Sequence, residues 1–376
     1  MPRPPSNRTT EAPLLKYKTR RKNKYASLFR CCVIFFMVLF ILLLIAFIIV
    51  FVILPLIFKY SVELQKDLVF PIYDLHPTNA QFDNFSNYDL YGARNIYVSV
   101  NESENIVLGV WHLLPEALVN ISRENKDFNY TESLTKSDYP IVLHFHGNGG
   151  NRVANLEMYN VLRMFFHVIA FDYRCYGDSS KGVLSEANVV DDSVELYKWL
   201  TLQTNAEVYF WGHSLGSSIS AHTIAKLNKE MIAPAGLFLE SPFNRLRDEV
   251  KYVETLFWFT KIFLWMPWYE ATMVDPFEEN GLVFNTADYI LNVDCPIMII
   301  HAEDDSVVPI DLGRRLYETA IIFRNISVQG NVTFYSIPES LELNHWHIYA
   351  VSDLPNYIRN HIDECEEFIT SNKLNE

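Results

Sequence analysis

The hydropathy pattern is dominated by one apolar run near the N-terminus. Residues 31–58 form 28 consecutive positions without a charged or strongly polar side chain, whereas about 20 residues suffice to cross the hydrocarbon layer of a membrane. A cleaved secretory signal has a shorter apolar core and small residues at its cleavage site. We therefore expect a transmembrane signal-anchor helix over residues 31–58, preceded by a basic tail over residues 1–30.

Beyond residue 138, short apolar runs alternate with longer amphipathic segments. The short runs are rich in Val, Ile, Leu and Phe, as in strands that are covered on both faces; they are residues 141–144, 168–171, 208–211, 236–239 and 297–300. Helices are expected between them, for example over residues 186–200 and 215–228. This alternation predicts an α/β fold with an open, mostly parallel, doubly wound sheet over residues 139–376.

Two other parts of the chain depart from this rhythm. In the lead-in over residues 59–138, runs 96–100 and 106–111 alternate with period two and predict an antiparallel meander. Between about residues 242 and 292 the rhythm breaks, and residues 256–269 hold three of the seven tryptophans. This insert is interpreted either as a buried helix or as a helical cap over an active site, with an apolar face for lipid.

Charge is distributed very unevenly along the chain. Residues 1–32 carry nine Lys or Arg and one acidic residue, so their net charge of +8 leaves −22 for the rest of a chain whose total is −14. A net charge of this size repels the phosphate backbone of nucleic acids, which argues against nucleic-acid binding. Five cysteines in 376 residues exclude a disulfide scaffold. No zinc-ligand spacing, P-loop or dinucleotide fingerprint is present, so no metal or cofactor is expected.

The same asymmetry predicts how the anchor is oriented. Nine cations precede the span and only Lys59 and Lys66 follow within ten residues, so the N-terminus is expected in the cytosol. Residues 59–376 then face a lumen, as in a type II protein of the endoplasmic reticulum or plasma membrane. Six Asn-x-Ser/Thr sequons are candidate glycosylation sites: Asn84, Asn101, Asn120, Asn129, Asn325 and Asn331. Cys31 and Cys32, at the cytosolic end of the span, are either S-acylated or plain membrane-embedded thiols.

One motif carries a nucleophile in a suitable context. Gly212-His213-Ser214-Leu215-Gly216 directly follows an expected strand and precedes an expected helix, which is the setting of the G-x-S-x-G nucleophile turn. Glycines are needed at both flanks because side chains there would collide with neighbouring backbone. We predict that Ser214 is a nucleophile at this sharp turn; an ordinary glycine-rich turn is the alternative.

A nucleophilic serine requires a histidine base and a carboxylate that orients it. In α/β folds that carry the G-x-S-x-G nucleophile turn, the three residues follow one another along the chain in the order serine, acid, histidine. The turn after the strand at 297–300 contains Glu303, Asp304 and Asp305. Asp305 is the predicted acid, with Asp304 as the alternative and Glu303 a weaker one. His345 is the predicted base, with His347 as the alternative.

The loop after the strand at 141–144 is rich in glycine and is where the fold draws an oxyanion donor. The predicted donors are the backbone N–H groups of Asn148 and Leu215. His146, which begins this loop, is interpreted as a structural hydrogen-bonding residue. Asp172 also ends an expected strand, but it precedes the serine in the chain and is expected to brace its own loop.

Taken together with these motifs, residues 139–355 resemble a family of membrane-anchored enzymes, the alpha/beta-hydrolase domain-containing protein 12 family. The resemblance rests on HGN at 146–148, FDYRCYGDS at 171–179, GHSLG at 212–216, HAEDDSVVP at 301–309 and the H-x-x-I-Y that His345 begins. It implies an alpha/beta-hydrolase fold and hydrolysis of lysophosphatidylserine and monoacylglycerols. Matched residue by residue, it implies the triad Ser214, Asp305 and His345. Cys175 departs from it, because glycine is usual at that position.

Three functions are compared on this basis. The leading hypothesis is a serine lipase that takes membrane lipids, lysophospholipids or monoacylglycerols, as substrates. The first alternative is a protein S-acyl thioesterase or other carboxylesterase, although S-acyl groups mostly face the cytosol and this domain is expected in a lumen. The second is an inactive hydrolase fold used for binding, which a complete serine, acid and histidine set disfavours. The sequence does not determine the oligomeric state.

Overall fold

The computed structural model describes residues 12–73, 75–256 and 261–373. The chain divides into two compact units, Met1–Phe58 and Lys59–Glu376. The described residues of the first unit form one long helix of α1 (Ala12–Ile48), a π-helical turn (Ile49–Ile53) and α2 (Leu54–Tyr60), whose last two residues belong to the second unit. Pro55 explains the π turn, because proline has no amide hydrogen and its ring displaces the carbonyl four residues earlier.

Within the described residues, one helix is long and apolar enough to cross a membrane: the segment Lys24–Tyr60, of mean hydropathy 3.7. It contains the whole of the predicted span over residues 31–58. The helix also continues toward the N-terminus as far as Ala12, into the basic segment. The segment expected to anchor the chain is therefore one continuous helix.

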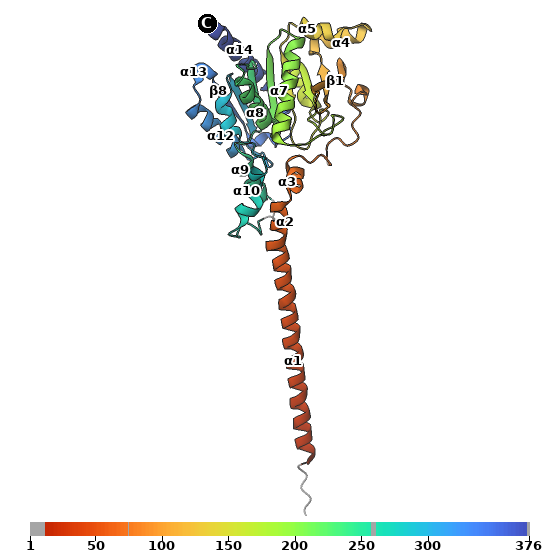
Figure 1. Cartoon of the computed structure of the whole chain (residues 1–376), viewed down its shortest axis with the longest axis vertical. Coiled ribbons are helices and arrows are strands. Elements are labelled where there is room, and N and C mark those ends of the chain that lie inside the picture. The colour runs from red at the N-terminus through yellow and green to blue at the C-terminus, as the bar shows by residue number, and fades with distance from the viewer. Residues whose placement is uncertain (1–11, 74, 257–260, 374–376) are drawn as a thin grey trace, which may run out of the picture. The chain divides into compact units, whose positions relative to one another are not determined.

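The second unit is built on an eight-stranded sheet in the order β1-β2-β4-β3-β5-β6-β7-β8 (Figure 1). The strands are β1 (Ala93–Asn101), β2 (Ile106–Leu113), β3 (Ile141–Phe145), β4 (His167–Phe171), β5 (Val208–His213), β6 (Gly236–Glu240), β7 (Ile297–Ala302) and β8 (Val332–Ile337). β2 pairs antiparallel with β1 and with β4, and every pair from β4 to β8 is parallel. The predicted meander and the predicted parallel sheet are both confirmed.

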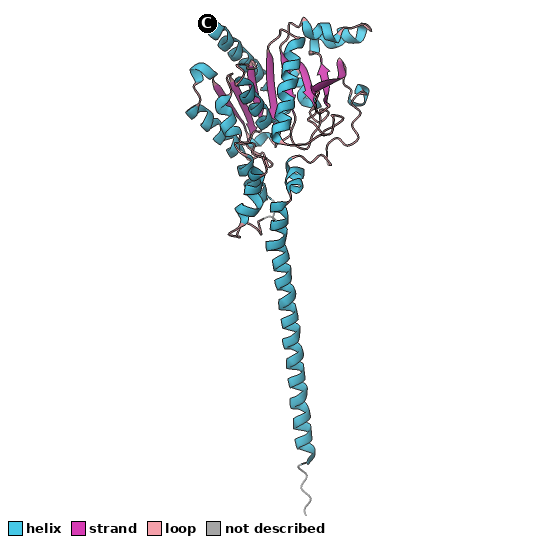
Figure 2. Ribbon diagram, in the orientation of Figure 1, coloured by secondary structure: helices cyan, strands magenta, loops and turns pink. Residues whose placement is uncertain are grey.

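Helices cover both faces of this sheet (Figure 2). The longer ones are α3 (Val62–Val69), α4 (Glu116–Glu124), α6 (Leu156–Leu162), α7 (Glu186–Gln203), α8 (Leu215–Asn228), α9 (Leu246–Leu256), α12 (Ile310–Phe323) and α14 (Leu354–Lys373). The shorter ones are α5 (Tyr130–Thr135), α10 (Asp275–Glu279), α11 (Thr286–Tyr289) and α13 (Ile326–Gln329). Helices α3, α4 and α5 lie in the lead-in over residues 59–138, for which the sequence predicted strands and named no helix.

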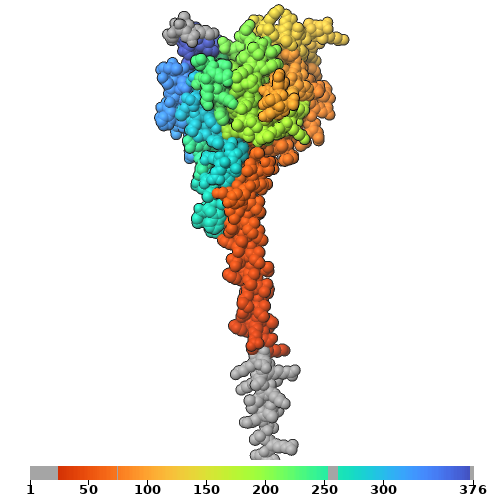
Figure 3. Space-filling model, in the orientation of Figure 1, coloured from red at the N-terminus to blue at the C-terminus, as the bar shows by residue number. Residues whose placement is uncertain are grey.

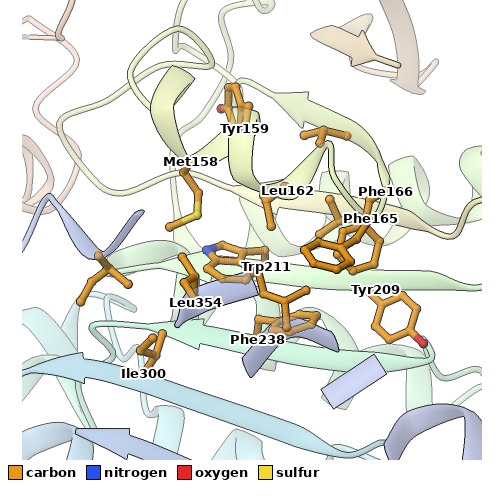
Figure 4. Packing of buried hydrophobic residues seen from close by; sticks show 14 of the residues in the cluster. Met158, Tyr159, Leu162, Phe165, Phe166, Tyr209, Trp211, Phe238, Ile300 and Leu354 are labelled. Carbon is orange, nitrogen blue, oxygen red and sulfur yellow. The ribbon is translucent and has the colours of Figure 1, made fainter. Parts of the chain in front are cut away.

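The alternation of side chains along β5 assigns the helices to the two faces. Trp211 packs in one buried cluster with Met158 and Leu162 of α6 and Leu354 of α14 (Figure 4). Phe210, the preceding residue of β5, instead contacts Tyr197 of α7, with ring centroids 5.3 Å apart. Successive side chains of a strand point to opposite faces. Helices α6 and α14 therefore cover one face and α7 the other.

The insert between β6 and β7, which is called the cap below after its predicted role, contains no strand within its described residues. It holds α9, a π turn (Glu270–Val274), α10, α11 and a 3₁₀ turn (Ile290–Asn292). Trp265 and Trp268 are 56% and 37% exposed, so the described part of the aromatic segment is not the buried helix of the alternative interpretation. Figure 3 shows the insert, in blue-green, as a projection at the surface of the second unit. Phe257 and Trp258 lie outside the described residues.

Two groups of hydrogen bonds fix this cap to its surroundings. Two residues of the lead-in bond it: Lys59 Nζ donates to the Ala271 carbonyl (2.9 Å), and Gln65 Oε1 accepts from Asn280 Nδ2 (2.8 Å). On α7, the buried Glu186 accepts from the backbone amides of Val283 and Phe284, at 2.9 and 2.8 Å. The cap is thus held both by the lead-in and by a helix of the sheet domain.

Candidate active site

Ser214 lies at a strained turn between β5 and α8. Its φ and ψ are 54° and −119°, a conformation that non-glycine residues rarely adopt and that costs on the order of 1–3 kcal/mol. The turn is held because the Ser214 amide donates to the carbonyl of Glu240, the last residue of the neighbouring strand β6 (2.9 Å). Helix α8 begins at the next residue, Leu215. This is the strand-turn-helix geometry that the motif predicted.

The two glycines of the motif are required by close packing. A Cβ on Gly216 would lie 2.2 Å from the carbonyl oxygen of Phe145, and one on Gly212 would lie 2.5 Å from the carbonyl oxygen of Gly216. Neither contact is possible for a real side chain. Gly147 likewise lies against the turn, because its Cβ would be 3.5 Å from Ser214 Cβ. The first turn of α8 therefore packs directly on the end of β3 and on the following loop.

A buried acid and a buried histidine meet at the same edge of the sheet. Asp305 follows β7, His345 lies in the loop after β8, and His345 Nδ1 donates to Asp305 Oδ2 at 2.7 Å. The other oxygen, Oδ1, accepts the amides of Val307 and Val308 at 2.9 and 2.8 Å. His345 Nε2 is buried and has no hydrogen-bond partner within the described chain, so it is available to accept a proton.

The alternatives left open by the sequence make other contacts. Asp304 accepts the amide of Asn344 at 2.9 Å, and Glu303 accepts the hydroxyl of Ser336 at 2.7 Å. The ring of His347 is 3.1 Å from the carbonyl oxygen of Leu343. The geometry thus pairs Asp305 with His345, while the other three candidates shape the loops around this pair.

The environment of the pair favours an ionised acid and a neutral base. Burial by itself would raise the pKa of Asp305, but hydrogen bonds from His301 and His345 hold that pKa below its ordinary value. Burial lowers the pKa of His345 to about 4, although the hydrogen bond and negative charge of Asp305 act in the opposite direction. His345 is therefore neutral near pH 7, as a general base must be before the reaction.

The loop after β3 presents backbone donors next to Ser214. The Asn148 carbonyl accepts the Tyr176 hydroxyl (2.9 Å), and the Gly149 carbonyl accepts the amide of His76 (3.0 Å), so the loop is fixed from both sides. Within the described residues, the amide of Asn148 donates to no acceptor. The amide of Leu215 opens α8, where helix N–H groups lack intrahelical partners. Among the described residues, neither amide therefore has an acceptor, which fits the predicted role of both as oxyanion donors.

His146 and Asp172 have the structural surroundings that the sequence suggested. His146 is buried, its Nδ1 lies 2.7 Å from the Gly147 carbonyl oxygen, and its own carbonyl accepts the Tyr173 hydroxyl at 2.8 Å. Asp172 is fully buried and accepts both the amide and the guanidinium of Arg152. Burial raises the pKa of Asp172 to about 6, while Arg152 opposes the rise. These residues connect the loops that follow β3 and β4.

Two histidines that the sequence analysis did not single out support the acid and the base. His301 Nε2 lies 2.8 Å from the Val308 carbonyl oxygen and 3.2 Å from Asp305 Oδ2. Both partners only accept, so Nε2 carries the hydrogen. His213 Nε2 lies 3.1 Å from the carbonyl oxygen of His345, and the two rings are 4.8 Å apart. The motifs HAEDD and GHSLG contain these histidines, but only the folded chain brings them to their partners.

The departure at Cys175 falls where glycine would be favoured on backbone grounds. Cys175 has φ of 70°, a left-handed conformation that costs L-residues about 1–2 kcal/mol. Its thiol compensates in part, because Sγ donates to the Gly182 carbonyl (3.2 Å) and accepts the Gly182 amide (3.4 Å). The thiol therefore ties this turn to the backbone of Gly182.

Comparisons with known proteins agree with this architecture. The family described as alpha/beta hydrolase fold matches residues 140–233. Lysophosphatidylserine lipase ABHD12 of Xenopus tropicalis is 31% identical over 318 residues, which cover 84% of this chain and 80% of that protein. The protein of the same name from Danio rerio is 32% identical, with 81% and 78% covered. The solved alpha-beta hydrolase of Vibrio vulnificus shares the fold at 14% identity, with a TM-score of 0.53 and coverage of 81% and 92%. The chain therefore belongs to the ABHD12 family of alpha/beta-hydrolases.

Proposed function

We propose that this protein is a membrane-anchored serine hydrolase that cleaves the fatty-acyl ester of lysophospholipids, lysophosphatidylserine in particular, and of monoacylglycerols. The single observation that carries the proposal is the Asp305–His345 pair, whose unpartnered Nε2 lies at the sheet edge that also holds the Ser214 turn. The names of the relatives supply the substrate class. Both types of substrate carry a single fatty-acyl ester.

In the first half of the reaction, Ser214 Oγ attacks the carbonyl carbon of the ester while His345 Nε2 takes the hydroxyl proton. The amides of Asn148 and Leu215 stabilise the negative oxygen of the tetrahedral intermediate. The ester C–O bond then breaks, and His345 passes the proton to the departing glycerol oxygen. The fatty acyl group remains on Ser214 as an ester.

In the second half, water attacks this acyl-enzyme and gives its proton to His345 Nε2. The second intermediate collapses, the bond to Ser214 Oγ breaks, and the proton returns to that oxygen as the fatty acid leaves. Asp305 accepts the Nδ1–H throughout, which fixes the tautomer and stabilises the imidazolium that forms in each half.

A serine-directed label and a lipid panel test this proposal. Wild-type protein should react with a fluorophosphonate probe and release fatty acid from lysophosphatidylserine and from a monoacylglycerol. Ser214→Ala should lose both the label and the release. Activity on S-acyl peptides without activity on either lipid would instead favour the thioesterase alternative.

We propose further that the catalytic unit is lumenal in the endoplasmic reticulum, in a type II orientation. The basic segment before the anchor supports this orientation. Five of the six sequon asparagines are exposed (Asn84, Asn120, Asn129, Asn325 and Asn331), and Asn101 is half-buried. Glycosidase treatment should therefore reduce the apparent mass. Protease sensitivity of the catalytic unit in sealed microsomes, without any glycan, would reverse the orientation.

A further inference from the structure

One stretch of the surface gathers exposed apolar side chains outside the membrane-spanning segment. It covers the end of α12 and the short helix α13, and its five members, 46% to 69% exposed, are called the apolar cluster: Ile321, Ile322, Phe323, Ile326 and Val328. Within the described residues, no other eight-residue stretch of the second unit holds as many. Apolar side chains that are exposed singly are ordinary. A close group of them is a binding surface or an aggregation liability unless something covers it.

The charge present in this stretch does not make its surface polar. Residues 321–328 contain one charged residue, Arg324, which is only 6% exposed. Its Nη2 atom donates to the carbonyls of Val293, Cys295 and Gln329 at 2.8, 2.9 and 2.6 Å. The guanidinium therefore ties the turn between α12 and α13 to the interior. The exposed side chains around it are apolar, apart from Asn325 and Ser327.

The apolar cluster lies far from the candidate active site. Asp305 and His345 follow the carboxyl ends of the parallel strands β7 and β8, whereas α13 precedes β8 and so lies at the amino edge of the sheet. Helix α12 runs between these edges, and its 14 residues span about 21 Å. Figure 1 shows α13 and the cap helix α10 at different ends of the second unit. The cluster is therefore not part of the surface that receives the substrate.

A glycosylation sequon stands in the middle of the apolar cluster. Asn325 begins the sequon Asn-Ile-Ser, and every member of the cluster lies within four residues of it. Asn325 is exposed, and its side chain makes no hydrogen bond within the described residues. Its Nδ2 atom, the attachment point of an N-linked glycan, is therefore free. By contrast, Asn331 donates its Nδ2 to Glu364 at 2.8 Å. Three further sequon side chains also make hydrogen bonds: Asn84, Asn101 and Asn129.

We propose that Asn325 carries an N-linked glycan that covers the apolar cluster. The glycan is added in the lumen, where the Asn325 Nδ2 atom displaces a lipid diphosphate from C1 of a lipid-linked oligosaccharide diphosphate. The Nδ2–C1 bond forms, the C1–O bond to the diphosphate breaks, and the amide gives up one proton. This inference rests on the lumenal orientation proposed above and goes beyond the hydrolysis at Ser214.

The sugar complements this surface chemically. One face of a pyranose ring presents C–H groups that pack on apolar and aromatic side chains, while its hydroxyls stay in water. Phe323 lies two residues before Asn325 and is 69% exposed, so its ring is available to the first sugar. Val328, three residues after Asn325, lies on the same side of the single turn of α13. The bulk of the glycan then keeps a second protein from docking on the cluster.

Footprinting of the full chain tests this coverage directly. The protein is made in eukaryotic cells and held in lipid nanodiscs. Mass spectrometry then measures the glycan occupancy of Asn325 and the hydroxyl-radical labelling of Phe323. Because labelling follows exposed area, Asn325→Gln should raise the labelling of Phe323 at least about threefold over the glycosylated wild type. The matched control is Asn120→Gln, which removes another exposed sequon asparagine without a side-chain hydrogen bond in the described chain, and it should leave this labelling unchanged.

Loss of the glycan should also make the protein self-associate. Light scattering should show about threefold more aggregate for Asn325→Gln than for the wild type, because an uncovered apolar patch promotes association. Adding Ile322→Lys and Phe323→Lys should restore the wild-type behaviour, since two charges then replace surface that the sugar covered. Lipid hydrolysis by the unaggregated fraction should stay within about twofold, because the cluster is remote from the site.

The outcomes separate this proposal from those on which it rests. An unoccupied Asn325 in a protein that is glycosylated elsewhere would overturn it, and a second copy or another protein bound at the cluster would then be what covers it. Occupancy without any change in the labelling of Phe323 would overturn the covering role. If no sequon is occupied and the catalytic unit is accessible from the cytosol, the lumenal orientation fails first. Hydrolysis is a separate readout, so a failure of the proposed enzymatic function leaves this test intact.

Discussion

At the scale of single residues, the site depends on one unit of three side chains. Replacing any member of such a unit removes most of its effect, so Ser214→Ala and His345→Ala should lower kcat by similar factors, on the order of 10³ or more. Asp305→Asn should lower kcat roughly 10³- to 10⁴-fold, because the histidine is then held in the wrong tautomer. These rates are measured as fatty acid released per enzyme.

The matched controls are the candidates that the geometry leaves aside. His347→Ala and Asp304→Asn should retain activity within about tenfold, because their side chains bond loop backbone rather than the acid or the base. A greater loss in His347→Ala than in His345→Ala would move the base by two residues and refute this assignment.

Part of this residue-level picture could be predicted from sequence and part could not. Ser214 could be predicted because its motif is local, with the strand, the glycines and the helix all within a few residues. The choice between Asp304 and Asp305 was open, because adjacent side chains differ only in the direction the folded turn gives them. His213 and His301 were missed because their partners depend on folding: His213 bonds a residue 132 positions away.

At the scale of elements, the nucleophile turn requires close backbone contact between α8 and β3. Gly216→Ala should push the first turn of α8 from the Phe145 carbonyl, destabilise the protein by about 1–3 kcal/mol and reduce kcat by at least tenfold. Gly149→Ala serves as the stability control, since its Cβ would meet nothing within 4 Å. Chemical denaturation and lipid hydrolysis measure the two effects; equal stability of both variants would contradict the packing argument.

The strands were also predictable as elements, whereas their order in the sheet, the helices of the lead-in and the contacts of the cap were not. Strands β3 to β7 are short apolar runs, and their alternation with helices predicts a mostly parallel sheet without giving the strand order. Helices α4 and α5 carry no comparable signal because both lie on the surface with few buried residues. The cap is fixed by Glu186, which is 97 and 98 positions from the amides it accepts, and no local pattern encodes such a contact.

At the scale of the whole molecule, buried titratable groups set the pH dependence of stability. Burial lowers the pKa of six histidines. The pKa falls to about 4 for His146, His167 and His345. It is also lowered for His112, His144 and His361. Between about pH 6.5 and 4 the unfolded chain then binds protons that the folded chain does not, so stability falls as pH falls. Four carboxyls with raised pKa values, Asp172, Asp192, Glu240 and Glu249, oppose this effect and are outnumbered by the six histidines.

The expected slope is about 1.4 kcal/mol per pH unit for each net proton. Thermal melting of the full chain in detergent at about pH 7, 6 and 5 measures it. The midpoint should fall steadily from neutral pH downward. A constant midpoint across this range would mean that the histidines are not kept neutral by the fold.

How an acidic enzyme meets lipid is the remaining question at this scale. A net charge of −22 outside the basic segment is repelled by anionic membrane surfaces over roughly 8 Å at physiological salt, so apolar contact must bring the site to its substrate. We therefore expect the exposed Trp265 and Trp268 to enter the headgroup layer.

Removing these two rings should weaken the contact with the membrane without touching the chemistry. Each partly inserted ring contributes about 1–2 kcal/mol by area, so Trp265→Ala with Trp268→Ala should lower activity on vesicle-embedded lipid about 30- to 900-fold and spare a short soluble ester. Leu202→Ala with Met231→Ala removes two apolar side chains that are even more exposed, one on helix α7 and one in the turn after α8, and should change neither rate. Equal losses on both substrates, together with a lower melting temperature, would show instead that the tryptophans contribute to the packing of the cap. A folding defect lowers activity on every substrate, whereas a lost membrane contact lowers activity only on the embedded lipid.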